Sequence, residues 1–364
     1  MYEAKPDVSE FLEEWKALYD SKSGERGIYY RKGIRDKTEQ IGRRDADLIV
    51  GTNPCGEIAL RSAGLCNLTE VVVRSRDSLD DLVRKVKLAT VLGTIQSTYT
   101  DFRYVRNIWK RNAEEERLLG VSLTGIYDHP VLGGQADEDV TIGWLDTLRE
   151  TARETNAGLA EQLGINPSVA ITTVKPSGTV SQLVDSASGI HPRHSEYYIR
   201  AIRQDNKDPL TQFLAASGVP SEPDVMKPND TTVFYFPVKA PDGAVTRKEV
   251  TPRKHLDLWR LYNKHWAEHQ VSVTVSVADK EWVDTAAWVY DNFDDLSGIS
   301  FLPYDGGTYR QQPYTDCTKE EYEALVAKMP KELDWSKLSE FETEDMTTGV
   351  REMACTGGAC DVAW

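Results

Sequence analysis

The sequence predicts an α/β fold in which a mostly parallel sheet is covered by helices. From Leu48 to about Pro313, apolar or alternating segments typical of strands take turns with segments whose apolar residues recur at helical spacing. Such alternation is typical of parallel sheets with helices packed outside them. The length of 364 residues suits two ordinary domains or one large α/β domain, and 40% hydrophobic residues suffice for a sizeable core.

Residues 1–45 are expected to form a charged, largely helical lead-in, because residues 11–19 place their apolar side chains at helical spacing. A second helix is predicted over residues 78–100, and a buried strand is predicted over residues 169–174. The apolar stripe expected on the second helix consists of Leu79, Leu82, Val83, Val86, Thr90 and Leu92.

A short helix is expected to begin at Thr179, because residues 179–182 have the form of a capping box. Further strands are predicted over residues 231–238 and 271–277, where the sequence alternates or runs apolar. Helical patterns accompany these strands, at residues 255–269 and 279–290.

The C-terminal part changes character after the main α/β unit, which we assign to residues 46–315. An acidic helix is expected to begin at Thr318, within a short helical segment at residues 316–340. Beyond this segment the chain is polar with few apolar anchors, so residues 341–364 are predicted to form a flexible tail.

The net charge of −15 argues against extended binding to a nucleic-acid backbone, although a small nucleotide can still bind at a local site. No apolar run approaches the ~20 residues of a membrane-spanning helix. The N-terminus lacks the basic-then-apolar pattern of a signal peptide. We therefore expect a cytoplasmic protein with no nucleic-acid or membrane partner.

Five cysteines are an odd number for a secreted disulfide scaffold, and their spacing is not that of a zinc site. Zinc binding by Cys355, Cys360 and a histidine ranks low, and no metal site is assigned. Reactive thiols in a reducing compartment are the better interpretation. Cys317 matches no motif and is interpreted as a bystander.

The most informative motif is Asn53-Pro54-Cys55-Gly56-Glu57, which carries an amide, a thiol and a carboxylate at alternate positions. Alternate residues of an extended segment point the same way, so the three groups are expected to meet around one substrate. The proline and glycine favour a tight, projecting loop. Ordinary turn chemistry with a buried cysteine is an equally good interpretation of this motif taken alone.

Other motifs accompany it in a fixed order, and together they resemble the large catalytic subunit of ribonucleotide reductases, which make deoxynucleotides from ribonucleotides. These motifs are SKSGERGI at 21–28, GLCNL at 64–68, KPSGTVS at 175–181, SGIHP at 188–192, SGISFLP at 297–303 and CTGGAC at 355–360. The resemblance covers nearly the whole chain.

The resemblance implies one half of the ten-stranded α/β barrel of that family, with the Asn53–Glu57 segment on a finger loop through its centre. It implies that Cys55 becomes a thiyl radical and abstracts the 3′-hydrogen of the substrate ribose. By the same resemblance Glu57 accepts the proton of the 3′-hydroxyl, and Asn53 hydrogen-bonds the ribose hydroxyls. A carboxylate acts as a base only within hydrogen-bond reach of that hydroxyl.

Cys66 is implied to be one half of the thiol pair that delivers two electrons and becomes a disulfide. The family's partner cysteine lies on an early barrel strand, and no cysteine precedes Cys55 here. No residue before Ser21 resembles the family's N-terminal half. We therefore expect a C-terminal half that is completed by a separate N-terminal-half chain, since half a barrel leaves a strand edge unpaired. A fragment of an interrupted gene is the alternative explanation.

In the family a loop like Pro176, Ser177, Gly178 and Thr179 holds the substrate's phosphates, and free N–H groups at a helix N-terminus suit that role. An ordinary glycine-containing helix cap is the plainer alternative. Cys355 and Cys360 resemble the mobile C-terminal pair that re-reduces the active-site disulfide and is reduced by thioredoxin or a glutaredoxin-type protein.

The wording of the motifs, and the eleven-residue step from Cys55 to Cys66, resemble the adenosylcobalamin-dependent class. Adenosylcobalamin is therefore the expected cofactor, and a ribonucleoside di- or triphosphate is the expected substrate. A metal-radical reductase half is the alternative, although Tyr304 and Tyr309 are not the adjacent pair that its radical relay uses. There are two rival functions: a non-catalytic half that completes a barrel, and a thiol–disulfide oxidoreductase.

Overall fold

The computed structural model describes residues 1–22, 24, 26–304 and 310–342. The chain divides into two compact units. Unit 1 comprises Met1–Arg193 and Gly243–Asp305, and unit 2 comprises His194–Asp242 and Gly306–Trp364. The main α/β segment expected from the sequence, residues 46–315, thus contains parts of both units.

The strands of unit 1 are mostly parallel, as the sequence predicts. Strands β4 (Asn67–Val72), β5 (Leu119–Thr124) and β6 (Thr172–Thr173) form one parallel sheet. β10 (Thr274–Val277) and β11 (Gly298–Pro303) form a second parallel pair. A parallel bridge from Val174 to Val271 continues β6 toward β10, and the short β1 (Gly27–Tyr29) pairs antiparallel with β11.

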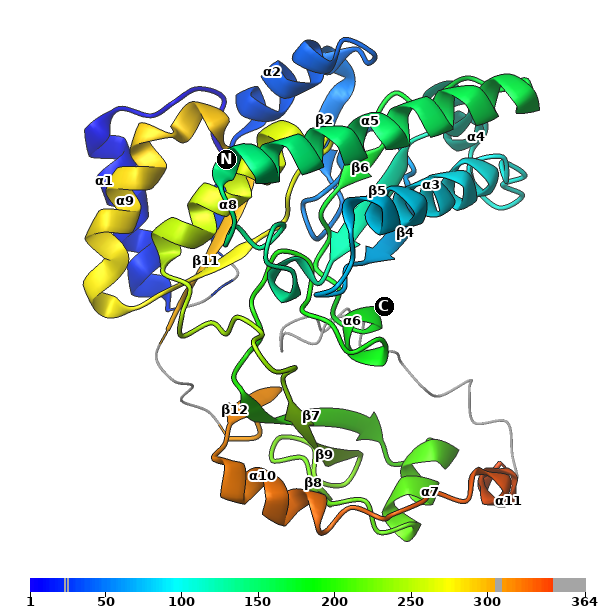
Figure 1. The fold of residues 1–364 in the computed structure, drawn as a ribbon, viewed down its shortest axis with the longest axis vertical. Coiled ribbons are helices and arrows are strands. Elements are labelled where there is room, and N and C mark those ends of the chain that lie inside the picture. The colour runs from blue at the N-terminus through cyan, green and yellow to red at the C-terminus, as the bar shows by residue number, and fades with distance from the viewer. Residues whose placement is uncertain (23, 25, 305–309, 343–364) are drawn as a thin grey trace. The chain divides into compact units, whose positions relative to one another are not determined.

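Helices cover these strands, and Figure 1 shows α3 (Leu79–Gln96) and α5 (Glu138–Leu163) running side by side over β4 and β5. The other principal helices of unit 1 are α1 (Val8–Ser21), α2 (Arg31–Ile41), α4 (Asn107–Glu116), α6 (Val180–Leu183), α8 (Pro252–His265) and α9 (Trp282–Asp291). The helices predicted near residues 11–19, 78–100, 255–269 and 279–290 are therefore confirmed.

The start of α3 is explained by its sequence. Its buried face is also the predicted one, except for one residue. Ser78 and Asp81 form a reciprocal capping box that begins the helix. Leu82 and Val86 are fully buried, as expected, but Leu92 lies on the opposite side and is 62% exposed. Placing Leu92 on the buried stripe was wrong, because it lies ten residues beyond Leu82 and helical rotation carries it away from the core.

The core of unit 1 is one continuous apolar cluster built from both of its sequence segments. Its largest fully buried side chains include Trp259, Trp266 and Phe293. The indole N–H groups of Trp259 and Trp266 donate to the carbonyl oxygens of Val271 (2.9 Å) and Thr173 (2.7 Å). These bonds satisfy the polar atoms of large buried rings, and they fix α8 against the strand ends around residues 173 and 271.

Unit 2 is an antiparallel sheet, which the sequence prediction of a mostly parallel sheet missed. Its strand order is β12-β7-β9-β8, and β7 (Tyr197–Asp205) pairs with β9 (Thr231–Lys239) along all nine residues. The remaining elements are β8 (Ser221–Pro223), β12 (Tyr314–Asp316), α7 (Pro209–Ala216), α10 (Lys319–Val326) and α11 (Leu338–Phe341). A separate core forms around Phe213 and Phe234. The helix predicted to begin at Thr318 is confirmed, with a Thr318–Glu321 capping box.

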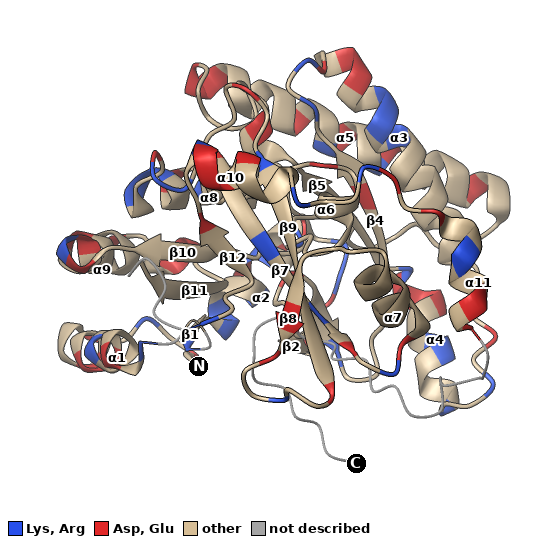
Figure 2. Cartoon of the chain, turned by 90° about the horizontal axis from the view of Figure 1, so that it is seen from below, with Lys and Arg blue, Asp and Glu red and all other residues tan. Residues whose placement is uncertain are grey.

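Acidic and basic residues are interspersed along the helices of unit 1, as the colours of the ribbon in Figure 2 show for α1, α3 and α9. Within the described part of the chain, none of the helices combines the length and apolarity needed to cross a lipid bilayer.

Two buried histidines of unit 1 predict an acid-sensitive fold. Burial lowers the pKa of His255 and of His269 from 6.5 to about 3, and each ring is held by a hydrogen bond to a backbone carbonyl oxygen. The unfolded chain therefore binds more protons than the folded chain between pH 6.5 and 3, so stability falls as the pH falls through this window. We expect a free energy of unfolding about 2–3 kcal/mol lower at pH 5.5 than at pH 7.5.

Urea unfolding at the two pH values measures this difference. His265→Asn is the matched control, because His265 lies near the surface beside Asp146, and its removal should leave the difference unchanged. Equal stability at pH 5.5 and 7.5 would contradict the assignment of His255 and His269 as neutral buried groups.

Candidate active site

The Asn53–Glu57 motif forms the tip of a short hairpin in unit 1. β2 (Ile49–Thr52) and β3 (Ala59–Arg61) pair antiparallel and flank the motif. Ile49 and Ala59 are buried against Ile34 of α2, which anchors the base of the hairpin. The tight, non-helical loop predicted from Pro54 and Gly56 is therefore present as the turn of this hairpin.

The tip itself is a turn, so the expectation of an extended segment was wrong. The amide of Gly56 donates to the carbonyl oxygen of Asn53 (2.9 Å), and the amide of Asn53 donates to the carbonyl oxygen of Ile58 (3.2 Å). Gly56 has a φ of 80°, in the left-handed region that favours glycine. As a result Cys55 is exposed whereas Glu57 is fully buried.

Hydrogen bonds tie the tip to the strand ends of unit 1. The carbonyl oxygen of Glu57 accepts from the amide of Gln270 (2.9 Å) and from Oγ1 of Thr173 (3.1 Å). The carbonyl oxygen of Cys55 accepts from Oγ of Ser272 (2.6 Å). The loop therefore has a fixed place against residues 173 and 270–272, although it lies more than 100 residues away in the sequence.

The Glu57 carboxylate is held by one oxygen only. Its Oε1 accepts from Nδ2 of Asn53 (2.7 Å) and from Nζ of Lys175 (2.9 Å). Its Oε2 is buried and has no hydrogen-bond partner among the described residues. A buried carboxylate oxygen without a donor is costly, so this atom is a candidate acceptor for a group supplied by a ligand.

The Asn53 amide is engaged within the loop at both ends. Its Nδ2 donates to Glu57, and its Oδ1 accepts from the amide of Ile58 (3.0 Å). Asn53 therefore positions the carboxylate in this structure. Its predicted contact with ribose hydroxyls stays a prediction.

Cys66 lies just before β4, and its sulfur packs against β5. A Cβ added at Gly120 would lie 3.3 Å from Sγ of Cys66, so the glycine leaves room for this thiol. Burial, followed by the negative charge of Glu57, raises the pKa of the Cys66 thiol well above its ordinary value. Cys66 is thus a protonated thiol in the electrostatic neighbourhood of Glu57.

The predicted phosphate loop, Pro176 to Thr179, lies at the N-terminal side of α6. Ser177 is buried, with its amide donating to Oγ of Ser188 (2.8 Å) and its Oγ accepting from the amide of Ser181 (3.1 Å). The amides of Gly178 and Thr179 have no acceptor within the described residues. The helix begins as expected, but Thr179 makes no side-chain cap, so the predicted capping box is wrong.

Cys355 and Cys360, predicted to form the redox tail, lie outside the described residues. Cys317 is a free, half-buried cysteine of unit 2. In the described part of the chain, no group of three or more histidine, cysteine or carboxylate side chains is placed to hold a metal ion.

Lys175 is the site residue that the sequence analysis missed. It was quoted only as part of the KPSGTVS motif, and it lies 118 positions from Glu57. No local pattern predicts a contact over that separation, so only the position of the lysine next to Pro176 could have drawn attention to it.

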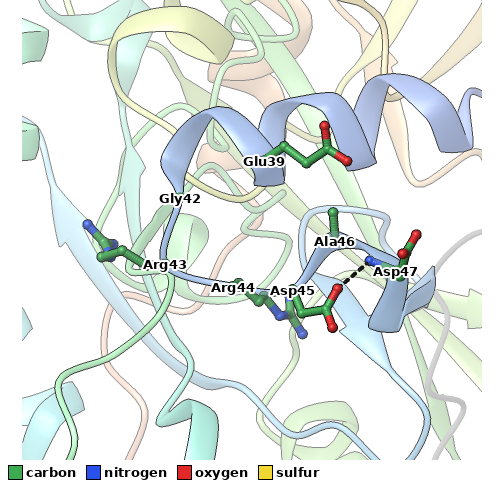
Figure 3. Close-up of a pocket in the computed structure, with 7 residues that line it drawn as sticks. All are labelled: Glu39, Gly42, Arg43, Arg44, Asp45, Ala46 and Asp47. Carbon is green, nitrogen blue, oxygen red and sulfur yellow. Dashed lines mark hydrogen bonds between the residues drawn. The ribbon is translucent and has the colours of Figure 1, made fainter.

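A surface hollow of about 510 Å³ lies elsewhere, between the end of α2 and the residues before β2 (Figure 3). It is lined by Glu39, Gly42, Arg43, Arg44, Asp45, Ala46 and Asp47. The hollow is open, carries both signs of charge and contains none of the motif residues. We therefore place the candidate active site at the hairpin tip rather than in this hollow.

Known proteins with related sequences have one name in common. The chain is 30% identical to the adenosylcobalamin-dependent ribonucleoside-triphosphate reductase of Euglena gracilis over 86% of this chain and 43% of that protein. It is 28% identical to the protein of the same name from Lactobacillus acidophilus over 92% of this chain and 46% of that protein. No family model matches the chain.

A solved structure gives the same picture of the fold. A B12-dependent (class II) ribonucleotide reductase matches 94% of this chain and 50% of its own chain, with a TM-score of 0.76 and 24% identity. The chain spans about half the length of each of these relatives. The motif resemblance is thus confirmed, and the chain is a relative of the adenosylcobalamin-dependent ribonucleotide reductases that corresponds to about half of such a protein.

Proposed function

We propose that this chain is the catalytic half of a ribonucleotide reductase, which converts ribonucleoside di- or triphosphates to 2′-deoxyribonucleotides. The observation that carries the proposal is the hairpin tip. It combines an exposed Cys55 thiol with a buried Glu57 carboxylate whose Oε2 has no donor among the described residues. A hydrogen-abstracting sulfur and a proton-accepting oxygen two residues apart on one turn fit the 3′-carbon and 3′-hydroxyl of a ribose.

In the proposed reaction the Cys55 thiyl radical removes the 3′-hydrogen atom, and Oε2 of Glu57 accepts the 3′-hydroxyl proton. The 2′-hydroxyl then leaves as water after protonation, for which the protonated thiol of Cys66 is suited. Two electrons come from Cys66 and a partner cysteine, which together become a disulfide. Cys55 finally returns the hydrogen atom to the 3′-carbon of the substrate and becomes a thiyl radical again.

The cofactor proposed is adenosylcobalamin, after the name of the relatives. When bound, it supplies an organic radical by homolysis of its Co–C bond. The exposure of Cys55 at the hairpin tip fits this source, because the thiol is accessible to a small-molecule radical from outside the chain. Cys55 is the only residue of this chain that we assign to the reaction with the cofactor.

The rest of the barrel is proposed to come from the half of the relatives that this chain does not match. Two features of unit 1 support this. Among the described residues β4 pairs with β5 alone, so its other edge is open to a further strand. The outer face of α3 also carries an apolar stripe, formed by Leu88, Leu92 and Ile95, which are 65%, 62% and 41% exposed.

The partner cysteine of Cys66 is expected on that additional half, and a thioredoxin or glutaredoxin-type protein is the proposed reductant of the Cys355–Cys360 pair. We propose a cytoplasmic location, where thiols stay reduced between turnovers. The rival interpretation, a non-catalytic half, leaves the unpaired Oε2 of Glu57 without a purpose.

Anaerobic reduction of a cytidine nucleotide with adenosylcobalamin and a dithiol tests the proposal. The assay compares this chain alone with this chain plus the product of its neighbouring gene. Deoxycytidine product that requires both polypeptides and the cofactor supports the proposal. Product only after addition of a metal-radical subunit overturns the cofactor, and no product under any of these conditions overturns the function.

The phosphate loop gives a separate prediction. A Cβ added at Gly178 would meet nothing within 4 Å, and the residue has no left-handed φ, so Gly178→Ala should fold normally. If the substrate phosphates approach the free amides of Gly178 and Thr179, the added methyl group should obstruct them and lower kcat/KM by about 10- to 100-fold. Steady-state kinetics with Gly158→Ala as control measure this, because a Cβ at Gly158 also meets nothing. Equal kcat/KM for the two variants would contradict phosphate binding here.

A further inference from the structure

Lys175 is held beside Glu57 by its backbone as well as by its side chain. Its amide donates to Oγ of Ser122 (2.9 Å). Its carbonyl oxygen packs so closely against Gly189 that a Cβ there would lie 2.7 Å away. Its side chain is only 32% exposed and ends with Nζ 2.9 Å from Oε1 of Glu57. The ammonium group therefore has a defined position at the hairpin tip.

The ammonium of Lys175 faces two candidate catalytic groups. Burial lowers its pKa, but hydrogen bonding and attraction to Glu57, and then to Cys55, outweigh burial and leave the pKa raised. Lys175 thus carries its positive charge at physiological pH. Among the described residues, Glu57 is the carboxylate to which Nζ is bonded.

The two oxygens of the Glu57 carboxylate have different surroundings, and this difference is the central observation. Asn53 and Lys175 both donate to Oε1, whereas Oε2 is left buried without a donor. Two donors on one oxygen fix the plane and the rotation of a carboxylate, and they leave the lone pairs of the other oxygen in a defined direction. A buried carboxylate also needs a nearby cation, because an uncompensated buried charge is very costly.

We propose that Lys175 is a positioning residue of the reductase site, which orients the Glu57 carboxylate through Oε1 so that Oε2 faces the substrate hydroxyl. The ammonium also balances the negative charge of the carboxylate until a substrate proton reaches it. This inference rests on the proposed function. A purely structural ion pair would stabilise the hairpin tip but would have no specific effect on the rate of proton acceptance.

A double-mutant cycle on kcat/KM tests whether Lys175 acts through Glu57. The variants are Lys175→Met, Glu57→Gln and the double variant, assayed in the complete, active enzyme. Lys175→Met should lower kcat by about 10- to 100-fold with little change in KM, because the base is misoriented. In the Glu57→Gln background the same change should cost less than about twofold, because no base remains to orient.

The dependence of kcat/KM on pH in Lys175→Met, and the rate of the conservative variant Lys175→Arg, provide two further measurements of the positioning role. Without the neighbouring ammonium, the acidic limb of kcat/KM should move to higher pH, because a nearby positive charge favours the ionised form of a carboxyl group. Lys175→Arg should recover a large part of the rate, because it keeps the charge. Lys85→Met is the matched control, since Lys85 is 30% exposed and its Nζ lies 2.6 Å from Asp77 in the same unit. This control should alter stability at most.

The outcomes separate the two proposals. Lack of activity in the unmodified enzyme would overturn the proposed function itself. With an active unmodified enzyme, a Lys175→Met effect that is equally large in the Glu57→Gln background, or an unchanged acidic limb, would overturn the positioning role. Thermal unfolding of each variant identifies any loss of rate that comes from misfolding, and Lys175→Arg then carries the test.

Discussion

Replacement of Cys55 by serine is expected to abolish nucleotide reduction without disturbing the fold. A serine O–H bond is stronger than a thiol S–H bond, so a hydroxyl cannot take over the exchange of a hydrogen atom with the substrate carbon. We expect kcat to fall by more than about 10⁴-fold, as for loss of an essential nucleophile. The free energy of unfolding should change by less than about 0.5 kcal/mol, because Cys55 is exposed at a turn.

Deoxynucleotide formation in the complete enzyme measures this effect, with Cys317→Ser as control. Cys317 is also a free cysteine, but it lies in unit 2 and is assigned no role. Its replacement should leave the rate within about twofold of the unmodified enzyme. A Cys55→Ser variant that retains one tenth of the activity would show that Cys55 is not the radical-bearing residue.

The periodic elements of the fold were predictable from the sequence because local patterns determine them. The helices α1, α3, α8 and α9 follow apolar spacings that persist over several turns. The Thr318 capping box formed as expected, whereas the one at Thr179 did not. Thr179 has helical backbone angles (φ −104°, ψ −52°) instead of the extended angles that a capping side chain requires.

The division into two units was not predictable from the same patterns. Unit 2 joins two segments that flank residues 243–305, and its central pair β7–β9 depends on a register between two strands of the first segment. Local alternation does not say with which strand, or in which direction, a strand pairs. The prediction of strands was therefore sound at residues 231–238, while their antiparallel pairing was missed.

The candidate site was predictable in its residue types but not in its geometry. The sequence placed Asn53, Cys55 and Glu57 together through an assumed extended strand. The hairpin turn brings Asn53 to Glu57 by a different route and leaves Cys55 outside. The hydrogen bond from Lys175 to Glu57 depends on strand ends that meet only in the folded chain. The motif alone could not predict this contact, because long-range packing determines it.

Replacement of Glu57 by glutamine is the second change expected to have a large effect. The amide keeps the size of the side chain and an oxygen that can accept from Asn53 and Lys175, but it cannot accept a proton from the substrate hydroxyl. We expect kcat to fall by about 10²- to 10⁴-fold, the usual contribution of a general base. The acidic limb of the pH profile should disappear with it, since the group that must lose its proton is gone.

Asp77→Asn is the matched control for Glu57→Gln, because Asp77 is also a largely buried carboxylate bonded to a half-buried lysine. Loss of this charge should lower stability while kcat stays within about twofold. An acidic limb that persists in Glu57→Gln would assign the base to another group. Because Oε2 of Glu57 is buried without a donor among the described residues, a stabilising role alone does not explain why a charge is kept at this position. A neutral side chain of the same shape would avoid the cost of burying it, so proton acceptance is the property that the carboxylate adds.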